Sequence, residues 1–87
     1  RVLFRSGMCQ GEKVKKQVLL KLGRNIRNLR LNQGISQEEL AFKIDSARNF
    51  IGCIERAEKS PTIYTLFRIA QALNIKIEEI VKDIDDI

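Results

Sequence analysis

The chain has 87 residues, with 16 Lys and Arg, 11 Asp and Glu, no histidine and a formal net charge of +5. This length allows one domain with a modest core. Without histidine the commonest general base and metal ligand is absent, and two separated cysteines cannot build a zinc site. No glycine-rich phosphate loop is present either. We therefore expect no enzyme activity, no metal and no cofactor.

The charge is unevenly spread along the chain. Residues 78–87 hold five acids and one base (net −4), whereas residues 1–77 hold 15 bases and six acids (net +9). A basic body with an acidic end suits a polyanionic partner on one face. No run of about 18 apolar residues occurs, and Cys9 and Cys53 do not suggest a disulfide framework. We expect a cytoplasmic protein without a membrane partner.

Residues 1–7 are kept out of the functional interpretation. Arg1–Ser6 resembles the translation of a common sequencing-adapter end, so these residues are expected to be a non-native tail that precedes a natural start at Met8. The alternative is a basic arm of the kind that reaches into the DNA minor groove.

The first predicted helix runs from about Lys13 or Lys15 to Asn32. Gly34 is expected to end it, because the left-handed conformation costs glycine nothing. Gly23 is interpreted as a tolerated weak point within it. One face of this helix carries apolar residues at helical spacing: Leu19, Leu22, Ile26 and Leu29.

Two shorter helices are predicted next, separated by a tight turn. Ser36 begins the second helix and, with Glu39 three residues later, forms a capping box. The turn comprises Asp45–Ala47, and Asp tolerates the left-handed region better than most residues. The third helix runs from about Ala47 to Arg56. The positions expected to face inward are Leu40, Ala41, Ile44, Ile51 and Ile54.

The remaining predicted helices follow a break at Lys59–Pro61. Thr62 caps a fourth helix, Ile63 to Leu73, which Asn74 ends. A fifth helix is expected from Ile77 to about Ile84. One face of the fourth helix is expected to hold Ile63, Leu66, Ala70 and Leu73. No segment shows sustained strand alternation, so the predicted fold is an all-α bundle of five helices.

Residues Asn25 to Leu73 resemble the phage-repressor and Cro type of helix-turn-helix domain, the XRE family. The sequence segments on which this resemblance rests are Ile26–Arg30, Ser36–Ala41, Arg48–Gly52, Ile54–Arg56, Ser60–Thr62 and Ile69–Leu73. The stretch Ile51 to Thr62 is most similar to the controller proteins of restriction–modification systems. The resemblance implies a lambda-repressor-like helix-turn-helix DNA-binding domain over residues 8–87.

The turn departs from the family pattern at three positions. Where this chain has Asp45, the family usually has Gly. It usually has an aliphatic residue at the position of Ser46, and Ser or Thr at the position of Ala47. The change at Ala47 removes a hydroxyl that could cap the third helix, and we expect that Asp45 or Ser46 could cap it instead.

The third helix is expected to read bases in the major groove. Arg48 is the first choice, because a guanidinium can bind both acceptors of a guanine edge, and Asn49 could bridge adenine. Cys53 lies four residues after Asn49 on the same side and could touch a thymine methyl. Ala47 belongs to the same set, and Gly52 is expected to permit close approach to DNA.

Other positions are expected to grip phosphates or to hold the fold. The phosphate candidates are Gln37, Arg56, Lys59, Ser60 and Thr62. The resemblance also implies that Arg30 pairs with Glu55, which would fix the first helix against the third. The expected homodimer interface comprises Phe67, Ile80, Val81 and Ile84, which alternatively could simply close the core of one monomer.

The leading functional hypothesis is a transcriptional regulator that binds an inverted-repeat operator in double-stranded DNA as a homodimer. RNA polymerase is a further possible contact. Two alternatives stay open at this point. One is an antitoxin that also binds a toxin through its C-terminal helix, and the other is a protein–protein adaptor that no longer reads DNA.

Overall fold

The computed structural model describes residues 7–86, with side chains from residue 11 onward. It contains α1 (Gly7–Asn32), α2 (Gln37–Lys43), α3 (Phe50–Glu55), α4 (Ile63–Leu73), α5 (Ile77–Ile80) and a short 3-10 helix, η2 (Ile84–Asp86). No strand occurs within this range, so the predicted all-α fold with five α-helices is confirmed. Of the seven residues assigned to a non-native tail, the first six lie outside the described part.

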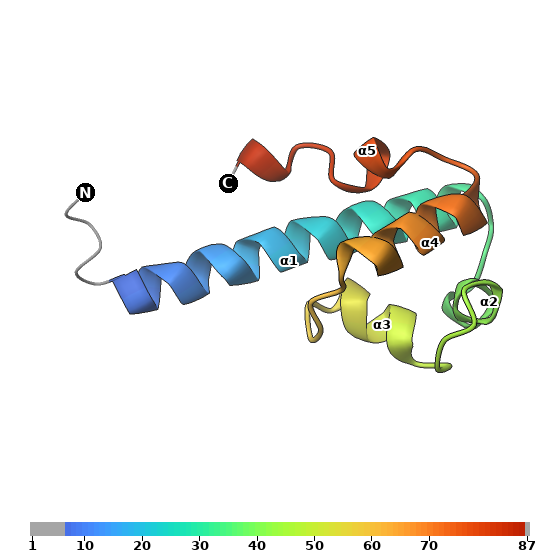
Figure 1. The fold of residues 1–87 in the computed structure, drawn as a ribbon, viewed down its shortest axis with the longest axis horizontal. Coiled ribbons are helices and arrows are strands. Elements are labelled where there is room, and N and C mark those ends of the chain that lie inside the picture. Colours follow the sequence, from blue (N-terminus) through green and yellow to red (C-terminus); the bar gives the residue numbers. More distant parts are fainter. Residues whose placement is uncertain (1–6, 87) are drawn as a thin grey trace.

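Helix α1 is longer than predicted, since it begins at Gly7 instead of Lys13 or Lys15. No proline interrupts residues 7–15, and Glu, Lys and Gln are good helix formers. At 1.5 Å per residue the helix spans about 39 Å. It therefore accounts for most of the 44 Å length of the molecule, and its N-terminal end extends beyond the other helices (Figure 1).

The core lies between α1, which packs on α3 and α5, and the helices α2 and α4, which pack on each other and on α3 and α5 respectively. Its largest fully buried side chains are Ile26, Leu40, Ile51, Ile54, Ile69, Leu73 and Ile80. Ile63 is expected on the same helix face as Leu66 and Leu73, but it is 69% exposed whereas those two residues are buried. The buried stripe of α4 is centred on Leu66, Ile69 and Leu73, and Ile63 lies at the margin of that stripe in the uncovered first turn.

The predicted helix boundaries at Ser36, Gly34, Thr62 and Asn74 are present. Ser36 Oγ accepts a hydrogen bond from the Glu39 N–H at 3.0 Å, and Thr62 Oγ1 accepts one from the Thr65 N–H at 3.2 Å. Gly34 and Asn74 both adopt the left-handed conformation, with φ of 69° and 58°. These groups satisfy backbone donors and acceptors that a helix end leaves free.

Helix α5 ends at Ile80, so the prediction of one helix up to Ile84 is wrong. The chain turns at Asp83, whose φ is 60°. Asn25 on α1 stabilises this turn, because its Nδ2 donates to the carbonyl oxygens of Ile80 and Lys82, each at 2.9 Å. One amide group therefore attaches the C-terminal segment to α1.

We expect Asn25→Ala to loosen the C-terminal segment. Two carbonyl groups would lose their donor, which costs about 1 kcal/mol for each hydrogen bond. Hydrogen exchange should accelerate at the amides of residues 79–86 while the amides of α2 and α3 keep their protection. Uniform acceleration throughout the chain would contradict this local role.

Candidate nucleic-acid interface

A left-handed residue turns the chain between α2 and α3. Asp45 has a φ of 59°, as its tolerance for this region predicts. The Ser46 N–H then bonds to the Ala41 carbonyl at 2.9 Å, and its Oγ donates to the same oxygen at 3.3 Å. The hydroxyl of Ser46 thus closes the end of α2. It leaves α3 uncapped, contrary to the expectation for Asp45 or Ser46.

Helix α3 is shorter than predicted and begins at Phe50. Ala47, Arg48 and Asn49 form the turn that precedes it, in which the Phe50 N–H bonds to the Ala47 carbonyl at 3.0 Å. Asn49 occupies the N-cap position without a side-chain capping bond. Its amide is therefore not used to hold the helix end.

The three residues of this turn are exposed, as a base-reading role requires. The Arg48 guanidinium meets one carboxylate, since its Nε lies 3.3 Å from Glu38 Oε2. Both side chains are largely exposed, at 80% and 68%, and such a surface pair contributes only about 0–1 kcal/mol. A DNA base could displace Glu38 at little cost.

Gly52 does not lie at the surface, which corrects its expected role in approaching DNA. The residue is buried. A Cβ atom there would lie 3.0 Å from Arg56 Nη1 and 3.1 Å from Gln37 Oε1. The missing side chain of Gly52 therefore makes room for the Gln37 side chain from α2.

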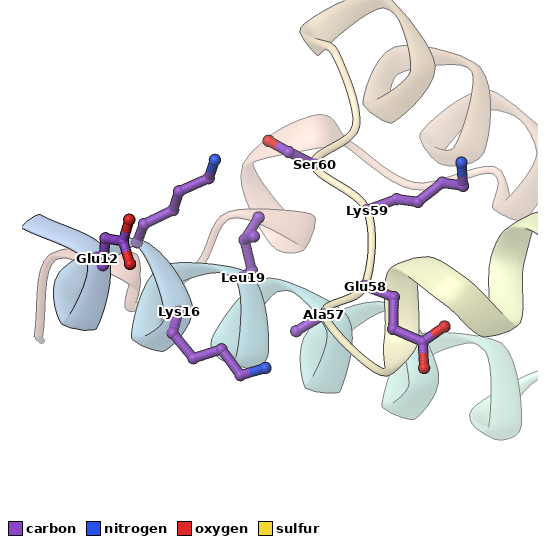
Figure 2. A pocket seen from close by; sticks show the side chains of 8 residues that line it. Glu12, Lys16, Leu19, Ala57, Glu58, Lys59 and Ser60 are labelled. Atoms are coloured by element: carbon purple, nitrogen blue, oxygen red, sulfur yellow. The ribbon is translucent and has the colours of Figure 1, made fainter.

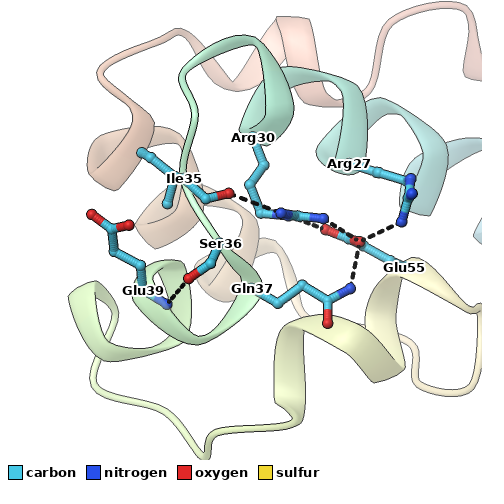
Figure 3. Close-up of polar contacts among 7 residues, drawn as sticks. All are labelled: Arg27, Arg30, Ile35, Ser36, Gln37, Glu39 and Glu55. Carbon is cyan, nitrogen blue, oxygen red and sulfur yellow. Dashed lines mark hydrogen bonds and ion pairs between the residues drawn. The ribbon is translucent and has the colours of Figure 1, made fainter.

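Arg30, Glu55 and Gln37 form a buried polar network that joins α1, α2 and α3 (Figure 3). Arg30 donates to Glu55 from Nε at 2.7 Å and from Nη2 at 3.1 Å. The two side chains are only 6% and 3% exposed. Arg30 Nη1 also donates to the Ile35 carbonyl at 2.8 Å. This bidentate geometry is the strong form of an ion pair.

Gln37 has a structural role that the sequence interpretation missed. Its Nε2 donates to Glu55 Oε1 at 2.9 Å, so the side chain expected to grip a phosphate is held from within. The amide has a second N–H and is half-buried, which leaves one donor for a phosphate. Arg27 adds a weaker contact, with Nη1 3.8 Å from the same carboxylate oxygen.

A second ion pair lies just after α3. Arg56 Nε is 3.0 Å from Glu58 Oε2, and Arg56 Nη2 is 3.8 Å from the Sγ of the half-buried Cys53. The hydrogen bond from Arg56 lowers the pKa of the Glu58 carboxyl below its ordinary value. The same pair raises the pKa of Arg56 above its ordinary value.

The remaining phosphate candidates lie on the segment between α3 and α4. Lys59, Ser60 and Thr62 are all exposed. Thr62 Oγ1 is already engaged with the backbone of Thr65 and lies 3.1 Å from Thr65 Oγ1. Lys59 and Ser60 make no side-chain hydrogen bond or ion pair within the described part of the chain, so they are free to meet a phosphate.

The four residues expected at a dimer interface are not equally available. Ile80 is fully buried in the monomer core, which corrects its assignment to an interface, and Ile84 packs against that core. Phe67 and Val81 remain 46% and 38% exposed. The sequence interpretation missed Tyr64, which is 63% exposed and stacks on Phe67 with ring centroids 6.5 Å apart.

In residues 7–86 no helix is long and apolar enough to span a membrane. The side chains described from residue 11 onward include no group of three or more metal-binding residues. Helices α2 and α3 are joined by a turn that displays an exposed arginine and asparagine, and the buried pair of Arg30 and Glu55 holds α3 against α1. This arrangement is typical of the helix-turn-helix class of DNA-binding domains.

Comparisons with known proteins agree with this class. The family model described as "Helix-turn-helix" matches residues 26–80. The control protein C.SmaI of Serratia marcescens is 37% identical over 59 residues, which are 68% of this chain and 70% of that protein. The control protein C.BamHI of Bacillus amyloliquefaciens is 31% identical over 64 residues, which are 72% of this chain and 79% of that protein.

A solved structure is also similar. The restriction–modification controller protein C.AhdI from Aeromonas hydrophila superposes with a TM-score of 0.69 and 35% identity, covering 71% of this chain and 94% of that chain. The chain belongs to the XRE-type helix-turn-helix family of DNA-binding transcriptional regulators.

Proposed function

We propose that this protein binds an inverted-repeat operator as a homodimer and regulates transcription in the manner of a restriction–modification controller. The observation that carries the proposal is the exposure of Arg48 and Asn49 directly before α3, on a helix-turn-helix whose relatives include the control proteins C.SmaI and C.BamHI. A cytoplasmic location follows from this role.

Base reading is assigned to Arg48, Asn49 and Cys53, with Ala47 beside them. Arg48 can exchange the exposed carboxylate of Glu38 for the two acceptors of a guanine edge. Asn49 has an unused amide that can bridge adenine. Arg56, Lys59 and Ser60, with the free N–H of Gln37, are assigned to phosphates.

An exposed apolar strip supports the homodimer. On the first turns of α4, Ile63, Tyr64 and Phe67 are 69%, 63% and 46% exposed, and Val81 after α5 is also exposed. Burying such a strip against a second copy removes apolar surface from water. A two-fold dimer would place two α3 helices about 34 Å apart, one turn of DNA.

The test is selection from a pool of randomised duplexes with the 87-residue chain. A two-fold symmetric consensus is the expected result, because a two-fold dimer reads the same bases twice in opposite orientation. Recovery of no consensus would overturn sequence-specific binding and favour the antitoxin or the adaptor, in which protein contacts replace base reading. A consensus without symmetry would overturn the homodimer alone.

We expect Arg48→Ala to weaken binding to the selected duplex by about 1–3 kcal/mol and to relax the preference at one base position of each half-site. Fluorescence anisotropy with single-base variants of the duplex measures both effects. Arg24→Ala removes an exposed arginine from α1 and is the matched control. Equal affinities and equal base preferences for wild type and Arg48→Ala would remove Arg48 from the interface.

A further inference from the structure

One face of α1 changes character along the helix. Its C-terminal part packs against the core, whereas its N-terminal part carries charged residues. Leu22 and Ile26 face the core, and an α-helix repeats a face every three to four residues. Toward the N-terminus the same face carries Leu19 and then Glu12, Lys15 and Lys16. This part of α1 therefore lacks the apolar residues that would bury it against the chain's own core.

An open concavity of about 340 Å³ separates this charged face from the segment that follows α3 (Figure 2). Lys15, Lys16 and Leu19 line it from α1, whereas Ala57, Lys59 and Ser60 line it from the other side. Ala57 turns the segment with a φ of 62°, and the Glu58 N–H bonds to the Cys53 carbonyl at 2.8 Å. The backbone across the concavity is thus fixed in place.

Direct contacts connect this concavity to the candidate DNA-reading helix. Arg56 touches Cys53 on α3 and pairs with Glu58, which lines the concavity. Arg56 lowers the pKa of the Glu58 carboxyl most, Cys53 contributes less, and the charge of Lys16 makes the smallest contribution. Because Arg56 compensates the charge of Glu58, the three lysines that line the concavity face one remaining acid, Glu12, and the surface keeps a net positive charge.

We propose that Lys15 and Lys16, which lie across the concavity from the phosphate candidate Lys59, form a second phosphate-binding surface that contacts the backbone of the same duplex beyond the bases that α3 reads. The inference rests on the proposed function and extends it. A DNA strand that crosses Lys59 and Ser60 meets Lys15 and Lys16 on the opposite wall of the concavity. These contacts are sequence-independent, so they lengthen the bound stretch of DNA and add affinity without altering base preference.

The test compares two double variants of the 87-residue chain. Lys15→Gln/Lys16→Gln removes two charges from the proposed surface. Lys21→Gln/Arg24→Gln removes two charges from the same helix on a face that lines a different concavity beside Asp86. The midpoints of the two pairs are roughly 160° apart around the helix at 100° per residue. Glutamine is a good helix former, so both variants should keep the fold, which circular dichroism verifies.

The readouts are the salt dependence of binding to the selected duplex and the hydroxyl-radical footprint. For Lys15→Gln/Lys16→Gln we expect the slope of log affinity against log salt to become shallower by about 0.9 for each phosphate that is no longer neutralised. Protection should also shorten at one end of each half-site, while the selected consensus stays unchanged. The control pair should retain the wild-type slope and footprint.

The remaining outcomes each overturn the second phosphate-binding surface, the proposed function or both. If wild type binds the duplex and Lys15→Gln/Lys16→Gln matches it in slope and footprint, the second surface is overturned and the proposed function stands. An equal change of slope in both double variants would indicate diffuse charge attraction, which also overturns it. If wild type itself binds no duplex, the proposed function fails, and the second surface fails with it.

Discussion

Glu55→Ala is expected to destabilise the protein by about 3–5 kcal/mol, because it leaves the buried guanidinium of Arg30 without its counter-charge. Arg30 is 5% exposed and donates two of its hydrogen bonds to this carboxylate. Gln37 loses its acceptor in the same variant. Urea unfolding followed by circular dichroism measures the decrease in the free energy of unfolding.

Glu58→Ala is the matched control for that experiment. Glu58 also pairs with an arginine, but both members of that pair are more than half exposed. Water can solvate the arginine that remains, so the stability should change little. A second variant, Arg30→Met/Glu55→Leu, removes both buried charges and should be more stable than Glu55→Ala alone. Equal destabilisation by Glu55→Ala and Glu58→Ala would contradict the structural role of the buried pair.

Gly23→Ala is expected to destabilise the protein by about 1–3 kcal/mol or more through overpacking. A Cβ atom at this position would lie 2.7 Å from the carbonyl oxygens of both Ile54 and Glu55. These oxygens belong to the backbone of α3 and cannot move aside as a flexible side chain would. Alanine gains up to about 1 kcal/mol in helix propensity over glycine, and the clash outweighs this gain. Thermal unfolding measures the result.

Gly11→Ala provides a control of opposite sign in the same helix. Among the described residues, no atom outside the adjoining turns of α1 itself lies within 4 Å of a Cβ atom placed at Gly11, so only helix propensity acts there. That variant should be as stable as wild type or more stable, by up to about 1 kcal/mol. A stabilised Gly23→Ala would show that α1 and α3 are not in close contact at Gly23.

The sequence predicts those features that depend on local chemistry. Apolar residues at helical spacing locate α2 and α4, and the capping residues Ser36 and Thr62 place their first turns correctly. Asp45 adopts the left-handed conformation that its short polar side chain tolerates. Each of these depends on residues that are close together in the chain.

The features that could not be predicted depend on contacts between distant residues. The sequence pattern indicates a weak point at Gly23 and an approach to DNA at Gly52. In the structure each glycine makes room for another element, the α3 backbone at Gly23 and Gln37 at Gly52. The end of α5 depends on Asn25, more than fifty residues earlier in the chain. A helical pattern in residues 77–84 carries no information about that amide.

The exposed residues of the candidate interface are harder to place from the sequence than the buried residues that support them. The family resemblance implies the pair of Arg30 and Glu55, and the structure brings these two residues together. Arg48 and Asn49 instead lie in a turn before α3, although the helical pattern places both within the helix. The turn is three residues longer than that pattern indicates, because no side chain caps α3 earlier.

The network of Arg30, Gln37 and Glu55 has a consequence for the entropy of binding. Its hydrogen bonds connect α1, α2 and α3 in the free protein, so the relative positions of these helices are fixed before any partner arrives. Ordering a flexible side chain at an interface costs about 0.5–1.5 kcal/mol. In this protein that cost is confined to the exposed side chains, such as Arg48, while the backbone that presents them is already rigid.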